Sequence, residues 1–190
     1  MSKRKPLNSI ALGERSDVAI KKGAATTIIA GMIAPSFALN DQFGNVVHSN
    51  KLLARRPLAL FFFRALWCDY CVRELAAVEK AADLLRDRGA AVVGVSQYRS
   101  SEVSRFGLDT GISFPVLNDE LGRVVDAYGL RSVMPVAHIA IHGSDWAPVP
   151  ARFVIAKNGV VAYGDADPDY THRPDPTELA PIISRIHTAR

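Results

Sequence analysis

The hydrophobic pattern is strongest in the middle of the chain, where continuous apolar runs alternate with helical spacing. Residues 57–63 (PLALFFF) contain no polar side chain, which is typical of a central strand buried on both faces. Residues 90–95 (AAVVGV) predict a second buried strand. Apolar positions between the two runs recur three or four residues apart, which predicts one long helix over residues 68–88. These positions are Leu75, Val78, Ala82 and Leu85.

Shorter patterns predict strands on either side of this centre. Two short strands, residues 37–39 and 46–47, are separated by the polar turn sequence DQFGN. Toward the C-terminus, residues 151–156 and 160–164 are apolar runs around the sequence KNG. An Asn-Gly pair between two apolar runs is the strongest short hairpin signal, so we predict two antiparallel strands here.

The order of the elements indicates an α/β fold. The remaining predicted elements are a short strand at residues 114–117 and helices at residues 100–108, 121–128 and 176–188. Strands that alternate with helices and end in a hairpin predict a central mixed sheet with helices on both faces. We expect one domain over residues 31–190, after a weakly patterned basic arm over residues 1–30. Residues 131–150 contain three prolines and a glycine, and we predict them to be irregular.

The charge distribution argues against nucleic-acid and membrane partners. The net charge is +4, and residues 1–22 carry all of it, with six basic and two acidic side chains. A nucleic-acid-binding face would place the excess on the folded domain. The apolar stretch at residues 23–34 is too short to span a bilayer. Signal-peptide cleavage near Ala38 would cut the first predicted strand. We therefore expect a cytoplasmic protein.

The two cysteines stand where the central strand ends and the long helix begins. Cys68 starts the predicted helix and Cys71 follows one turn later. Free N–H groups and a positive partial charge at a helix N-terminus favour thiolate over thiol. Such sites lower a cysteine pKa from about 8.5 to about 7 or below. In a reducing compartment, this spacing indicates a redox pair or half of a metal site.

A metal site is the weaker of these interpretations. A structural zinc site needs four ligands, and the chain has no cysteine beyond the pair. His138 and His142 are four residues apart, but they lie in a proline-flanked apolar segment and do not pair with the cysteines. A role as core filler is equally unexpected at a strand-to-helix junction. We therefore expect a redox pair without a metal or any other cofactor.

Four stretches of the chain carry a family resemblance. They are APSFALNDQFGNVV, LALFFFRALWCDYCVREL, FPVLNDELGRVVDAYGL and VPARFVIAKNGVVAYGDADPDYTHRPDP, which together span about residues 31–188. In this order and spacing the chain resembles the alkyl hydroperoxide reductase/thiol-specific antioxidant (AhpC/TSA) family, in particular its peroxiredoxin-like members with a Trp-Cys-x-x-Cys site. The resemblance implies a thioredoxin-like fold and an antioxidant oxidoreductase with a redox-active disulfide.

The resemblance allows two alignments of the site. The common peroxiredoxin motif Pro-x-x-x-Thr-x-x-Cys places Cys71 in the peroxidatic position, with Glu74 three residues on. In that alignment Arg64 replaces the proline and Cys68 replaces the threonine. The thioredoxin motif Trp-Cys-x-x-Cys instead matches Trp67, Cys68 and Cys71 directly. We adopt this second alignment, which makes Cys68 the nucleophile and Cys71 the resolving cysteine.

A second departure from the peroxiredoxin pattern favours the same alignment. Peroxiredoxins carry an arginine in a late strand that stabilises the thiolate and the peroxide, and Pro150 stands at that position here. Thioredoxins place a cis-proline there. Because only X-Pro bonds adopt cis at low cost, we predict a cis Val149–Pro150 bond against the cysteine pair. Arg64 and Arg152 are the candidates to replace the missing arginine, and Arg152 should point to the sheet face opposite Ala151.

The sequence thus predicts a thiol-disulfide oxidoreductase or thiol-dependent peroxidase. Cys68 attacks a peroxide or a disulfide, and Cys71 resolves the product into a Cys68–Cys71 disulfide. An external thiol reductant, thioredoxin-like or glutathione-like, then reduces that disulfide. The residues leave peroxide and disulfide substrates open, and a homodimer is compatible with the resemblance. The alternative is a redox-responsive binding protein with negligible turnover, in which the disulfide switches a surface such as residues 131–150.

Overall fold

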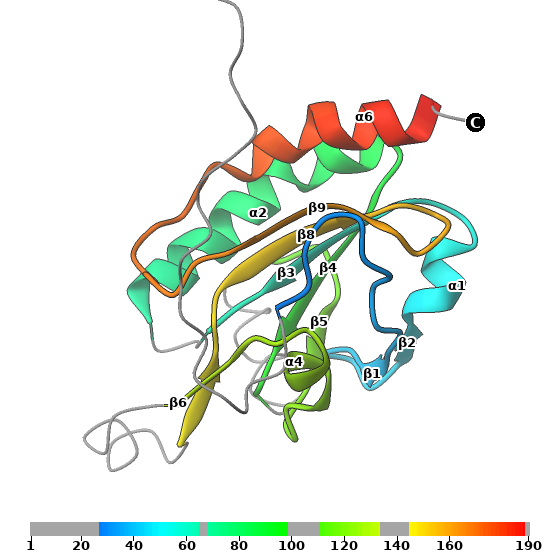
Figure 1. The fold of residues 1–190 in the computed structure, drawn as a ribbon. Helices are drawn as coiled ribbons and strands as arrows, with labels where there is room; N and C mark the ends of the chain where they lie inside the picture. The colour runs from blue at the N-terminus through cyan, green and yellow to red at the C-terminus, as the bar shows by residue number, and fades with distance from the viewer. Residues whose placement is uncertain (1–26, 65–67, 99–110, 134–144, 189–190) are drawn as a thin grey trace, which may run out of the picture.

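The computed structural model describes residues 27–64, 68–98, 111–133 and 145–188, and a five-stranded sheet forms its centre (Figure 1). The strand order is β5-β4-β3-β8-β9. β3 pairs parallel with β4 and antiparallel with β8, so the sheet is mixed, as predicted. The strands are β3 (Leu58–Phe62), β4 (Ala91–Ser96), β5 (Val116–Asn118), β8 (Ala151–Ile155) and β9 (Val161–Ala166).

Helices cover both faces of this sheet. On one face, α2 (Asp69–Asp87) lies beside α6 (Ala180–Thr188), which follows the 3-10 turn η1 (Pro176–Leu179) (Figure 1). The opposite face packs against α1 (Ser49–Leu53) and α4 (Arg123–Ala127). Because both faces are covered, every residue of β3 is buried, which explains the unbroken apolar run.

The predicted C-terminal hairpin is present, and the two short strands predicted near the N-terminus also pair with each other. β1 (Ala38–Asn40) pairs antiparallel with β2 (Val46–His48), and the Asp41 carboxylate accepts the N–H groups of Phe43 and Asn45 in the turn. β8 and β9 pair antiparallel around Gly159, whose φ of 83° requires a glycine-like backbone conformation. Both turns therefore form at the turn sequences DQFGN and KNG that the sequence analysis identified.

The segment predicted to be irregular contains two paired strands. β6 (Arg131–Val133) and β7 (Trp146–Pro148) form an antiparallel pair, so the prediction for these residues was wrong. Each strand is only three residues long, and residues 134–144 separate them, so neither shows a pattern of its own. The five-residue helix α1 was missed for the same reason. The predicted helix at residues 100–108 lies outside the described residues.

The described part of the chain starts before the predicted domain boundary. Ile28 is buried, and its N–H donates to the carbonyl oxygen of Tyr128. Thr27 Oγ1 donates to the Gly129 carbonyl oxygen. Residues from 27 onward therefore pack against the sheet and α4. None of the described helices is both long and apolar enough to cross a membrane.

Candidate active site

Cys68 and Cys71 lie at the junction predicted for them, just beyond the central strand. Cys68 is the N-cap of α2, and the Cys71 N–H donates to its carbonyl oxygen at 2.9 Å. The two cysteines are reduced and pack together against Tyr98. Cys68 is 5% exposed and Cys71 is fully buried, so the helix start is shielded from bulk water. Trp67 lies outside the described residues.

An arginine that the sequence analysis did not single out reaches Cys71. Arg173 follows β9, and its Nη2 atom lies 3.8 Å from Cys71 Sγ. A guanidinium at this distance favours the ionised form of the thiol. One feature of the sequence could have drawn attention to Arg173. Arg173 is the only Lys or Arg between residues 158 and 184, in a stretch rich in aspartates.

The same guanidinium pairs with Glu74, one turn further along α2. Arg173 Nε and Glu74 Oε2 are 2.7 Å apart and form an ion pair rather than a well-aligned hydrogen bond. Both side chains are nearly buried, at 11% exposure for Glu74 and 12% for Arg173. Burial raises the pKa of Glu74 to about 7, although the nearby charges of Arg173 and Arg152 act in the opposite direction. Arg173 therefore faces two acidic groups, Cys71 and Glu74.

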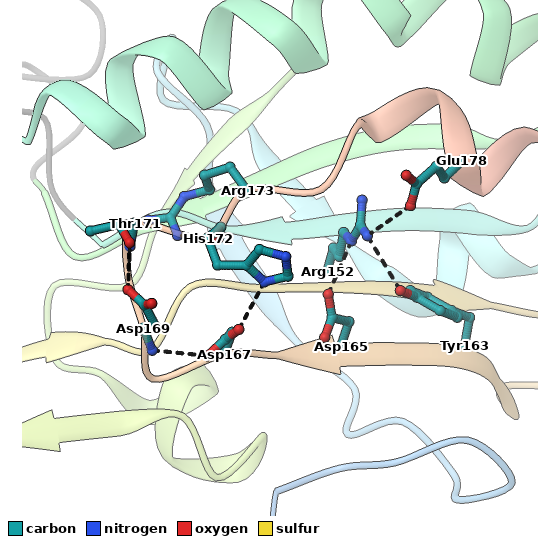
Figure 2. A network of polar contacts seen from close by, with 9 residues as sticks. All are labelled: Arg152, Tyr163, Asp165, Asp167, Asp169, Thr171, His172, Arg173 and Glu178. Atoms are coloured by element: carbon teal, nitrogen blue, oxygen red, sulfur yellow. Dashed lines mark hydrogen bonds and ion pairs between the residues drawn. The ribbon is translucent and has the colours of Figure 1, made fainter. Parts of the chain in front are cut away.

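Arg152 is the buried centre of a second polar network (Figure 2). It points to the α2 side of the sheet, whereas Ala151 packs in the core on the other side, as predicted. Its guanidinium donates to the Asp175 carbonyl oxygen, the Tyr163 hydroxyl, and the carboxylates of Asp165 and Glu178, at distances of 3.1–3.4 Å. These partners lie on β9 and at the start of η1. Arg152 thus links the end of β9 to the start of η1, and the chain between these two elements carries Arg173.

Local hydrogen bonds shape this segment, residues 167–173. His172 Nδ1 lies 2.8 Å from Asp167 Oδ2, and the Asp167 carboxylate also accepts the Asp169 N–H (Figure 2). The Asp169 carboxylate in turn accepts the N–H and the hydroxyl of Thr171. Residues 167–172 are therefore held by hydrogen bonds among themselves, and these bonds orient the chain immediately before Arg173.

Arg64, the other arginine named by the sequence, engages an aromatic pair beside the cysteines. Its guanidinium carbon lies 4.2 Å from the centre of the Tyr170 ring, a cation–π distance. The Tyr170 ring meets the Tyr70 ring edge-on, with the ring centres 5.9 Å apart. Arg64 thus connects the end of β3 with the segment that follows β9.

The predicted cis bond at Pro150 is wrong. No cis peptide occurs among the described residues, so the Val149–Pro150 bond is trans. Pro150 lies where the chain passes in extended form from β7 into β8, and the Val149 N–H donates to the Leu130 carbonyl oxygen. The bond therefore keeps the trans form, which X-Pro bonds prefer by about 0.5–1 kcal/mol. Pro150 still lines a small cavity together with Glu74 and Arg173.

A groove of about 540 Å³ opens next to the Glu74–Arg173 pair, between α2 and the segment leading to η1. Its size is in the range of small-molecule sites. Among its lining residues are Tyr70, Arg73, Lys80, Pro174 and Thr177. The described residues contain no group of three or more His, Cys, Asp or Glu side chains that could hold a metal ion.

This geometry defines a class of protein. A reduced cysteine pair at the start of a helix, next to the central strand of a thioredoxin-like sheet, belongs to a thiol-dependent oxidoreductase. The model of the AhpC/TSA family matches residues 30–164. The chain therefore belongs to the AhpC/TSA family.

Relatives of known sequence fall into two groups by name. The thiol-disulfide oxidoreductase ResA of Geobacillus kaustophilus is 27% identical over 138 residues, which is 72% of this chain and 68% of ResA. Peroxiredoxin Bcp of Escherichia coli K12 is 30% identical over 116 residues, which is 60% of this chain and 74% of Bcp. The chain is thus similar both to a protein named as a thiol-disulfide oxidoreductase and to one named as a peroxiredoxin.

Solved structures agree on the fold. Peroxidoxin BcpB of Mycobacterium tuberculosis superposes with a TM-score of 0.70 at 20% identity, over 86% of this chain and 99% of that one. The peroxiredoxin-like protein of Aquifex aeolicus gives a TM-score of 0.72 at 18% identity, over 86% and 90%. The predicted thioredoxin-like fold is confirmed.

Proposed function

We propose that this protein is a thiol-dependent peroxidase in which Cys71 attacks the peroxide and Cys68 resolves the product. The observation that carries the proposal is the Arg173 guanidinium, 3.8 Å from Cys71 Sγ. A nearby cation favours the thiolate, and guanidinium N–H groups can also donate to the peroxide oxygens. The sequence favoured Cys68 as the first nucleophile. The trans Pro150 bond and the position of Arg173 support the reverse order for a peroxide.

The reaction balances with these residues and one external reductant. The Cys71 thiolate attacks one peroxide oxygen, an S–O bond forms, the O–O bond breaks, and the leaving oxygen takes up a proton. This gives Cys71 sulfenic acid and water or an alcohol. The Cys68 thiol then displaces water from Cys71, forming the disulfide. An external dithiol restores both thiols by two exchange steps and is itself oxidised.

The position of the pair on α2 supports both steps. Cys68 is the N-cap and Cys71 lies in the first turn, where the positive end of the helix dipole adds to the effect of Arg173 on the thiolate. The two residues already pack against each other. Formation of the disulfide therefore needs only local adjustment of the first turn of the helix.

Stopped-flow oxidation of the reduced protein tests the substrate class. We expect hydrogen peroxide to oxidise the protein at least about tenfold faster than a small linear disulfide at equal concentration, a barrier difference of about 1.4 kcal/mol. Faster oxidation by the disulfide would contradict the peroxidase assignment.

Disulfide reduction is the second candidate function. It is favoured by the likeness to the protein named thiol-disulfide oxidoreductase ResA and by Cys68 at the very start of α2. A third possibility from the sequence, a redox-responsive binding protein, differs in turnover. With excess dithiol and peroxide, an enzyme consumes many equivalents of peroxide, whereas a sensor is oxidised once per chain.

A further inference from the structure

Two acidic groups on α2 share one cation. Cys71 and Glu74 are three residues apart on the helix, which places them on the same face. Arg173 contacts both, with Nη2 at 3.8 Å from Cys71 Sγ and Nε at 2.7 Å from Glu74 Oε2. All three side chains are buried or nearly so. One guanidinium can balance one negative charge here, and a second anion would lie uncompensated in a poorly hydrated site.

Among the described residues, the cations that act on the pKa of Glu74 are Arg173 and Arg152. Arg73 and Lys80 also line the groove beside Glu74, but Arg73 donates to the Asp69 carbonyl oxygen and lies over the Tyr70 ring, and Lys80 is exposed to solvent. Arg152 from β8 acts on Glu74 from a distance, but its own guanidinium bonds the carboxylates of Asp165 and Glu178. Asp167 lines the small cavity beside Glu74, and its carboxylate forms an ion pair with His172. The local balance therefore favours a single negative charge shared between Glu74 and Cys71.

We propose that Glu74 takes up the proton that Cys71 releases, so that the two groups hold one proton between them and Arg173 faces whichever one is ionised. This rests on the proposed function, in which Cys71 is the attacking thiolate. The raised pKa of Glu74, about 7, supports the exchange because it brings the carboxyl into the range of an activated thiol. Glu74 is thus a proton store for Cys71.

The proton balance of the peroxide step closes with this store. Cys71 thiol and Glu74 carboxylate become Cys71 thiolate and Glu74 carboxylic acid. When the thiolate attacks and the O–O bond breaks, the departing oxygen needs one proton to leave as water or an alcohol. Glu74 gives up its proton, and its carboxylate pairs with Arg173 again while Cys71 is a neutral sulfenic acid. The site carries the same net charge before and after the step.

A water-sized cavity gives this proton a route to and from the surface. Its volume is about 10 Å³, close to the minimum for one water molecule. The cavity is also lined by Asp167 and His172, whose side chains form an ion pair and are 37% and 60% exposed. One water there would link the Glu74 carboxyl to titratable groups at the surface.

A thiolate titration without any substrate tests the coupling. In a Cys68→Ser background, Cys71 is the only thiol, and the ultraviolet absorbance of its thiolate is followed against pH. We expect Glu74→Gln to lower the apparent pKa of Cys71 by at least about one unit, because the competing anion is removed. Glu79→Gln, on the same helix but bound to the Ser113 N–H, is the matched control and should leave the titration unchanged.

The direction of the shift separates this proposal from a purely structural role. If Glu74 only held Arg173 in place, Glu74→Gln would loosen the arginine and raise the pKa of Cys71. An unchanged or raised pKa would overturn the proposal. The titration contains no peroxide, so its result does not depend on the peroxidase assignment. The stopped-flow comparison of peroxide with a disulfide tests that assignment separately.

Infrared difference spectroscopy provides a second measurement with Glu74 intact. Above neutral pH, the Cys68→Ser protein should show the carbonyl band of a protonated carboxyl, because the Cys71 thiolate occupies Arg173. Adding Cys71→Ser removes the thiolate, so Glu74 should ionise and the band should disappear. A band of equal size in both proteins would mean that the two groups titrate independently and would overturn the proposal.

Discussion

Arg173 and Cys71 are 102 residues apart in the sequence, and the guanidinium Nη2 of one lies 3.8 Å from the sulfur of the other. The contact joins the start of α2 to the segment between β9 and η1. Arg152 is bonded to both ends of that segment, at Asp165 and at Asp175. The segment that places a charge next to the Cys71 sulfur is therefore bonded to a network whose centre, Arg152, lies on β8.

Removing the Arg173 charge should make Cys71 a weaker acid. We expect Arg173→Met to raise the pKa of Cys71 by about 1–2 units, because a cation within a few ångströms lowers a neighbouring acid's pKa by that order. The rate of alkylation against pH, measured in a Cys68→Ser background, reports the shift. Arg173→Lys should recover part of it. Arg86→Met, near the far end of α2, is the control. An unaltered alkylation profile in Arg173→Met would separate Arg173 from the thiol's chemistry.

The two cysteines should differ in their single-turnover behaviour. With Cys71 as the attacking group, Cys68→Ser should consume one equivalent of peroxide and stop at a sulfenic acid that a dimedone-type reagent traps. Cys71→Ser should lose the fast reaction with peroxide. Mass spectrometry after one equivalent of peroxide distinguishes the two. Trapping on Cys68 in the Cys71→Ser protein, at the rate of the unaltered protein, would restore the order predicted from the Trp-Cys-x-x-Cys motif.

Loss of the buried Arg152 should cost stability as well as reactivity. We expect Arg152→Leu to lower the free energy of unfolding by about 1–3 kcal/mol, since several hydrogen bonds to a charged donor are lost. The partners Asp165 and Glu178 remain partly open to solvent, which limits the cost. Denaturant unfolding measures the change. Exposed Arg55→Leu serves as the comparison, and equal stability of the two variants would count against the network.

The same variant should affect the thiol indirectly. If the network positions the segment that carries Arg173, Arg152→Leu should also raise the pKa of Cys71, measured by alkylation as above. A loss of stability with an unchanged thiol pKa would show that Arg152 supports the fold alone.

Glu74 should make the protein less stable as the pH rises toward neutrality. Its pKa is raised from 4.5 to about 7 in the folded protein. Between these values the unfolded chain has lost the proton that the folded chain keeps, so stability falls as pH increases. The loss would amount to roughly 3 kcal/mol at about 1.4 kcal/mol per pKa unit. Once Glu74 is ionised in the folded chain as well, the contribution becomes constant.

A comparison with Glu74→Gln isolates this effect. The difference in unfolding free energy between the unaltered protein and the variant should move in favour of the variant from about pH 5 to pH 7. Chemical denaturation at a series of pH values checks it. A difference that is flat with pH would mean that the Glu74 pKa is the same in the folded and unfolded chains.

The local sequence pattern alone determined most of the secondary-structure elements and the position of the cysteine pair between them. The apolar run of β3, the helical spacing of α2 and the Asn-Gly turn before β9 each encode their element within a few residues. The junction between β3 and α2 then located Cys68 and Cys71, because the boundary between two strong patterns is itself visible in the sequence. The family resemblance rests on the same local stretches.

Only the tertiary structure decided what surrounds the sulfurs. Nothing near Arg173 in the sequence shows that it reaches a helix starting a hundred residues earlier. Whether packing overrides the trans preference of the Val149–Pro150 bond is likewise invisible in the local sequence. The pairing of β6 with β7 and the partners of Arg152 likewise join residues far apart in the chain. Such contacts depend on how the elements pack in space, and a local pattern carries no information about that distance.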